Sequence, residues 1–131
     1  MKRVVITGLG TINSTGHSVN ESFDAVVNGV CGIDKITLFD TTDFSVQIAG
    51  EVKNFDPETV MDKKEVKKAD RFIQLGIKAA LEAMIDSGFV TSENKKVDDS
   101  IANRFGIISG SGIGGLSTIQ KNSTICDTKG S

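Results

Sequence analysis

Three glycines near the C-terminus have the spacing of a motif that binds nucleotides. Gly110, Gly112 and Gly115 fit G-x-G-x-x-G between an apolar run and a helical pattern, the arrangement that holds a dinucleotide pyrophosphate at a helix N-terminus. That apolar run is the third of the chain, and Asp127 is too near to be the acidic ribose ligand expected about 20 residues on. We therefore interpret the glycines as a tight strand-to-helix turn.

The chain has few cysteine and histidine side chains, the types that act as nucleophiles or titrate near neutral pH. Cys31 and Cys126 are the two cysteines, and His17 is the single histidine. Two cysteines in a chain of this length do not make a disulfide framework, so we expect a reducing compartment and a cytoplasmic protein. We interpret Cys31 as a small buried thiol and Cys126 as an ordinary residue of a fraying C-terminal segment.

Charge and hydropathy exclude several classes of protein. The 131 residues include 15 basic and 17 acidic side chains, a net charge of −2, whereas binders of nucleic acid or anionic membranes carry a basic excess. Thr7 and Gly8 end the apolar run after Met1-Lys2-Arg3, which argues against a signal peptide. No window approaches the ~18 apolar residues that a membrane helix needs.

Strand patterns alternate with helix patterns, which predicts the α/β class. Apolar, β-branched or alternating residues predict strands over 3–7, 46–53 and 104–109, while residues 29–42 are expected to be irregular. A polar surface loop, with room for a short helical turn, is expected over 91–103. Strand, crossover helix and strand in this order imply a parallel sheet.

Capping signals and apolar periodicity predict two helices. Ser18 and Glu21 have capping-box spacing before a helix over 19–28, which Gly29 should end. We expect its apolar side chains to face a core: Phe23, Val26 and Val27. A longer helix is predicted to run from a cap at Asp62 to Gly88. Its core-facing stripe comprises Val66, Ala69, Ile73, Ile77, Ala80 and Met84, and its small residues for close packing on a sheet are Gly76, Ala79, Ala80 and Ala83.

Several motifs, taken in order, resemble one enzyme family. Residues 4–10 read V-V-I-T-G-L-G, residues 70–74 read D-R-F-I-Q, and residues 110–116 read G-S-G-I-G-G-L. This ordered set is similar to the beginning of type II elongating β-ketoacyl-[acyl-carrier-protein] synthases and covers essentially the whole chain. The resemblance implies an incomplete thiolase-like α/β fold, part of the N-terminal half with a mixed sheet and packed helices. Residues 1–131 would be one N-terminal fragment, about a third of the enzyme, with no internal boundary.

The resemblance also implies an acyltransferase of fatty-acid biosynthesis that condenses malonyl-carrier protein with an acyl chain, as a homodimer and without cofactor or metal. Family members use a cysteine within T-A-C-S/T-S-G and two histidines. Neither Cys31 nor Cys126 lies in such a segment, and His17 cannot supply two imidazoles. We therefore assign no catalytic residue and expect this chain alone to be inactive. Two alternatives are a non-enzymatic remnant that binds a carrier protein or synthase partner, and a small nucleotide-binding domain.

Two binding regions follow from the same resemblance. Ile113 matches the residue that borders the acyl pocket near the dimer interface, where an apolar side chain suits a fatty acyl tail. Lys64, Lys67 and Lys68 match basic residues that hold acyl carrier protein in related synthases. From the residues alone, Ile113 is equally well explained by packing, and the lysines are better explained by a solvated helix face.

The resemblance finally implies that central strands of the sheet come from chain beyond residue 131. The predicted strands 3–7 and 104–109 would then lack neighbours and expose backbone groups and apolar surface. Since the net stability of a domain is only ~5–15 kcal/mol, we expect the chain alone to be partly molten or to aggregate, with broad thermal unfolding and dye binding.

Overall fold

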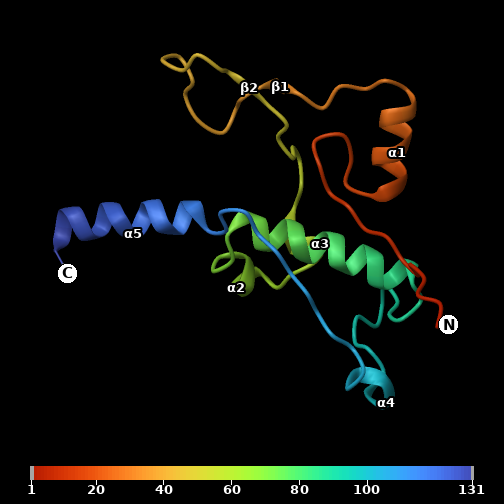
Figure 1. Cartoon of the computed structure of the whole chain (residues 1–131). Helices are drawn as coiled ribbons and strands as arrows, with labels where there is room; N and C mark the ends of the chain where they lie inside the picture. Colours follow the sequence, from red (N-terminus) through yellow and green to blue (C-terminus); the bar gives the residue numbers. More distant parts are fainter. Residues whose placement is uncertain (1, 131) are drawn as a thin grey trace.

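The longest helix, α3, is the element beside which the N-terminal segment, α2 and the start of α5 lie (Figure 1). The structure is a computed structural model that describes residues 2–130. Helix α3 covers Arg71–Asp86, and Gly88, with a φ of +77°, ends it as predicted because glycine adopts this conformation without a steric penalty.

The helix predicted from residue 62 is interrupted before α3. The short helix α2 (Lys63–Val66) is followed by a turn, and the backbone of Asp70 is extended, with a ψ of 157°. The buried Gln74 side chain donates from Nε2 to the carbonyl oxygens of Val66 and Ala69, at 3.3 and 3.0 Å. The prediction of one continuous helix was wrong, because Gln74 satisfies carbonyls at the break.

Helix α1 (Val19–Val27) agrees with the predicted helix at both ends. The Ser18 hydroxyl accepts a hydrogen bond from the Glu21 N–H at 3.2 Å. The Glu21 carboxylate accepts one from the His17 N–H at 2.7 Å, one residue earlier than in a capping box. Gly29, with a φ of +68°, follows the helix. The expected inward face was wrong, because these side chains are exposed: Phe23, Val26 and Val27.

The sheet formed by the described residues is a short antiparallel pair of strands. β1 (Asp34–Lys35) pairs with β2 (Ile48–Ala49). β2 is the middle of the predicted strand 46–53, which is therefore much shorter than expected, and β1 lies where irregular structure was expected.

The other two predicted strands are extended but unpaired segments. Within residues 2–130 neither 3–7 nor 104–109 takes part in a sheet. Their apolar side chains face solvent, with Val4 96% and Ile108 102% exposed. The predicted parallel sheet was wrong for the described residues, because extended backbone becomes a strand only beside a hydrogen-bonded partner.

Three further helices complete the chain. The 3-10 turn η1 (Pro57–Thr59) begins after Asp56, and α4 (Asp99–Ala102) lies in the polar loop where a short helical turn was expected. The 14-residue helix α5 (Leu116–Lys129) extends away from α3 with only its N-terminal end close to it (Figure 1). No helix within residues 2–130 is long and apolar enough to cross a membrane.

The N-terminal segment packs on α3 through backbone contacts. Gly8 and Gly10 lie so close to α3 that a Cβ atom on either would overlap its backbone, at the carbonyl oxygens of Ala83 and Ala79 respectively. The predicted close packing of small residues is therefore present at Ala79 and Ala83, although the partner is an extended segment instead of a sheet.

Two carboxylates of α3 hold the same segment. Asp86 Oδ2 accepts a hydrogen bond from the Leu9 N–H at 2.9 Å. Glu82 accepts from Thr11 N–H at 3.0 Å through Oε2 and from Val19 N–H at 2.7 Å through Oε1. Glu82 thus joins α3 to both the N-terminal loop and the start of α1. Its negative charge also interacts favourably with the positive end of the α1 dipole.

The apolar interior is small. Among residues 2–130, Val90 is the only apolar residue that is buried, with 6% of its surface exposed. The predicted core stripe of α3 is only partly covered, with Ile73 and Ile77 still 38% and 36% exposed. Phe89 and Phe105 pack edge to face with ring centroids 4.8 Å apart, which joins the end of α3 to the segment after α4.

Candidate functional site

Lys64, Lys67 and Lys68, here called the lysine patch, lie on α2 and in the turn before α3. All three side chains are exposed. The ion pairs within residues 2–130 use other lysines, including Lys63, which lies 3.8 Å from Glu58. No acidic side chain of the described residues therefore neutralises the patch directly, and its charge can act on a partner in solution.

Ile113 lies in the loop formed by residues 110–115, here called the glycine loop. Its side chain is 73% exposed. A groove of about 480 Å³ lies beside it, between Phe72, Ile73 and Ile77 of α3 and residues 109–111. Ile113 does not line this groove. Its side chain is open to solvent in this chain, whereas the resemblance predicts that it borders an acyl pocket.

Asp70 brings the lysine patch and the glycine loop together. The hydroxyl of Thr118, in the first turn of α5, donates to Asp70 Oδ1 at 2.8 Å. The other oxygen, Oδ2, lies where a Cβ on Gly115 would be placed. The sequence placed Asp70 in the D-R-F-I-Q motif but did not indicate this contact, because nothing in the local pattern relates Asp70 to a residue 48 positions later.

The same contact bears on the nucleotide-binding alternative. A pyrophosphate on the G-x-G-x-x-G motif would need the free N-terminus of α5. The Asp70 carboxylate lies there, and its negative charge opposes a phosphate. Residues 104–109, directly before the motif, form no paired strand in the described chain. The glycine of the loop with a positive φ, +75°, is Gly114, which is not one of the three glycines of the motif. The geometry favours the turn interpretation.

The contacts of the His17 side chain are structural. Its Nε2 atom is 2.8 Å from the carbonyl oxygen of Lys53, and its ring meets that of Phe55 edge to face at 6.0 Å. Arg71 lies over the same phenyl ring, 5.0 Å from its centroid, and donates to the Val52 carbonyl oxygen at 3.2 Å. These contacts fix the segment before η1 against α3.

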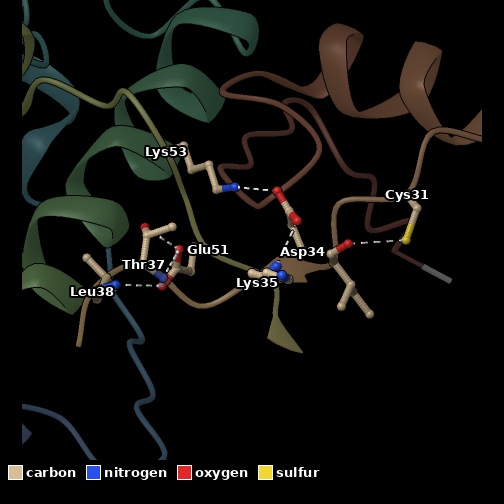
Figure 2. A network of polar contacts seen from close by, with 8 residues as sticks. Cys31, Asp34, Lys35, Thr37, Leu38, Glu51 and Lys53 are labelled. Carbon is tan, nitrogen blue, oxygen red and sulfur yellow. Dashed lines mark hydrogen bonds and ion pairs between the residues drawn. The ribbon is translucent and has the colours of Figure 1, made fainter. Parts of the chain in front are cut away.

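Both cysteines are exposed. The Cys31 thiol lies 3.8 Å from the carbonyl oxygen of Ile33 (Figure 2). The expectation of a buried thiol was wrong, because residues 29–33 run along the surface. Cys126 lies in the regular helix α5 rather than in a frayed segment. Residues 2–130 contain no cluster of three or more side chains suited to a metal ion.

A polar network that the sequence did not indicate organises the strand pair (Figure 2). Glu51 accepts hydrogen bonds from the Thr37 N–H and hydroxyl, at 2.9 and 2.8 Å, and from the Leu38 N–H at 3.2 Å. The Thr37 N–H and hydroxyl bonds, and that from Leu38, lower the pKa of Glu51.

The Lys53 Nζ atom lies 2.8 Å from Asp34 Oδ2. This bond lowers the pKa of Asp34 and raises the pKa of Lys53.

Comparisons with known proteins point to one family. Residues 1–130 match the family described as "Beta-ketoacyl synthase, N-terminal domain". The chain is 46% identical over 119 residues to 3-oxoacyl-[acyl-carrier-protein] synthase 2 of Staphylococcus aureus strain COL, covering 91% of this chain and 27% of that protein. The proteins of the same name from Vibrio cholerae and Coxiella burnetii are 45% and 41% identical, over 91% and 92% of this chain and 27% and 28% of theirs. The chain thus spans about a quarter of the length of these relatives, and by the match over nearly all its residues it belongs to the β-ketoacyl synthase family.

Proposed function

We propose that this chain is the N-terminal portion of a 3-oxoacyl-[acyl-carrier-protein] synthase of fatty-acid elongation. The observation that carries the proposal is the 41–46% identity to synthases of that name over about nine-tenths of the chain. The portion forms one unit over residues 1–131 without an internal boundary. The complete enzyme has a thiolase-like α/β fold with a mixed sheet, and acts in the cytoplasm as a homodimer.

The proposed reaction condenses malonyl-carrier protein with an acyl chain and releases CO₂. It needs a thiolate that carries the acyl group and imidazoles that assist decarboxylation. This chain contributes no such residue, because its cysteines lie outside a T-A-C-S/T-S-G segment and its only histidine is held by Lys53 and Phe55. Its contribution is binding, and condensation is expected to need residues that these 131 do not include.

The lysine patch is the proposed docking surface for acyl carrier protein. Three exposed cations within five residues, without ion-pair partners among the described side chains, present a concentrated positive charge. Such a charge attracts an acidic protein over a distance of the order of the Debye length and orients its approach. Ile113, on the neighbouring glycine loop, is the proposed contact for the acyl tail.

The test is a calorimetric titration of the chain with acyl carrier protein at low salt. Changing Lys64, Lys67 and Lys68 together to Glu should weaken binding by on the order of a hundredfold, since like charges then face each other. Raising the ionic strength to physiological values should weaken binding by the parent chain, because the Debye length falls to about 8 Å.

The matched control changes three exposed lysines elsewhere to Glu, which alters net charge equally: Lys95, Lys121 and Lys129. This control should bind with nearly the parent affinity. Equal losses in the two triple variants would contradict a local docking site, and binding insensitive to both would leave the lysines as a solvated face.

A further inference from the structure

Helix α5 meets the preceding elements at its first turn. Its N-terminal end lies beside α3, and the rest extends away (Figure 1). Within residues 2–130, the bond from Thr118 Oγ1 to Asp70 Oδ1, at 2.8 Å, is the hydrogen bond that joins α5 to residues before 104. The later threonines of α5 donate within the helix, as Thr124 does to the Gln120 carbonyl oxygen at 3.0 Å. Among the described residues, this is therefore the hydrogen bond that can fix the direction of α5 relative to α3.

Asp70 can make this contact because its carboxylate makes no capping hydrogen bond at its own helix. It occupies the N-cap position of α3, where an aspartate side chain usually accepts a hydrogen bond from the first turn. Here the side chain makes no capping bond. Both oxygens instead face the start of α5, one bonded to Thr118 and the other against the backbone of Gly115. A negative charge at that helix end is also favoured by the helix dipole.

The glycine loop is closely constrained at the same place. Gly114 has a φ of +75°, and the position of a Cβ on it lies 3.8 Å from Cζ of Phe72, in the first turn of α3. Gly115 has no room for a side chain while the Asp70 carboxylate stays in place. Fixing Asp70 therefore fixes the C-terminal end of the loop that carries Ile113.

We infer that Asp70 is a positioning residue that sets the placement of the glycine loop and α5 relative to the lysine patch. It lies two residues after Lys68, so the surface that receives a carrier protein and the loop that meets its acyl tail share one anchor. The functional meaning of this placement rests on the proposed function, whereas the anchor itself is a property of this chain.

The native cysteines allow a direct test in the 131-residue chain. Cys31 and Cys126 are both exposed, one near β1 and the other in α5. Nitroxide labels on them report the distance between α5 and the N-terminal half by double electron–electron resonance. For the parent chain we expect a narrow peak from folded molecules, which stands out above any broad background from partly molten ones. Thr118→Val, which removes the hydroxyl and keeps the shape, and Asp70→Ala, which removes the acceptor without removing a helix cap, should each lose the narrow peak.

Two further variants separate positioning from general damage to the helix. Thr118→Ser keeps the hydroxyl and should retain the narrow peak. Thr124→Val removes a hydroxyl that bonds only within α5 and should also retain it. A parent distribution without a narrow peak, an unchanged peak in Thr118→Val and Asp70→Ala, or an equal loss in Thr124→Val would each overturn the inference. Because no carrier protein is present, this result is independent of the titration that tests the proposed function.

Discussion

The N-terminal segment and the C-terminal third of the chain contact the same helix in different ways. Residues 8–19 are held on α3 by three hydrogen bonds to Glu82 and Asp86 and by the close approach of Gly8 and Gly10. The C-terminal third meets α3 through the bond from Thr118 to Asp70 and along the groove between α3 and residues 109–111. The polar contacts to backbone N–H groups of residues 8–19 are complete within the described chain. Apolar residues such as Ile107 and Ile108, by contrast, need a neighbouring strand that the described chain does not supply.

The largest effect on this comparison is expected from Gly10→Ala. The added Cβ would overlap backbone atoms of α3 at Ala79, which cannot rotate away as a side chain can. Residues 8–19 should leave α3, with loss of hydrogen-exchange protection at the Thr11 and Val19 amides.

The control for this change is Gly76→Ala, at a position on α3 where nothing lies within 4 Å of the added atom. It should retain protection, and should stabilise α3 by up to ~1 kcal/mol because alanine is the better helix former. Equal exchange at Thr11 in Gly10→Ala and the parent chain would show that the close approach does not hold the segment.

A smaller effect is expected from Glu82→Gln. A glutamine offers one acceptor oxygen in place of two, so one of the bonds from Thr11 and Val19 is lost and the other is no longer charge-assisted. Local stability at these amides should fall by roughly 1.5–3 kcal/mol, the range for a hydrogen bond to a charged group. Native-state hydrogen exchange measures this difference.

Glu93→Gln is the matched control, because this carboxylate is exposed and takes part in none of the ion pairs within residues 2–130. A loss of protection at Thr11 in both variants would point to net charge instead of the specific contact.

The smallest effect is expected at the strand pair as the pH falls. The pKa values of Asp34 and Glu51 lie below their ordinary values of 3.8 and 4.5. A carboxylate whose pKa is lower in the folded state stabilises that state above its unfolded pKa, and this contribution is lost as the pH falls through the folded pKa. Amide chemical shifts of Thr37 and Leu38 should therefore stay constant at neutral pH and have their transition midpoint below the ordinary glutamate pKa of 4.5. Glu51→Gln should remove the Thr37 transition, and a Thr37 transition near neutral pH would contradict the assignment.

Local signals predicted the elements whose stabilising contacts lie close in sequence. Ser18 before α1, Gly29 after it and Gly88 after α3 were readable because caps and positive-φ glycines act within a few residues. The break before α3 was not readable, because it depends on the Gln74 side chain turning back to Val66 and Ala69.

The strands and the anchor at Asp70 could not be predicted for a related reason. An apolar, β-branched run such as residues 104–109 indicates a preference for extended backbone, but pairing depends on another segment. The contact between Asp70 and Thr118 joins residues 48 positions apart, without a periodicity that relates them. The exposure of residues 3–7 and 104–109 agrees with the expected deficit of strand neighbours, and the broad thermal unfolding expected from it stays a prediction.

Binding of acyl carrier protein to the lysine patch is measured most directly by amide chemical-shift mapping on the isotopically labelled chain. Unlabelled carrier protein should perturb the amides around Lys64, Lys67 and Lys68 first. The amides around Lys121 in the outer part of α5 should change little. Perturbations centred on α5, or spread evenly over all exposed lysines, would contradict a docking surface at the lysine patch.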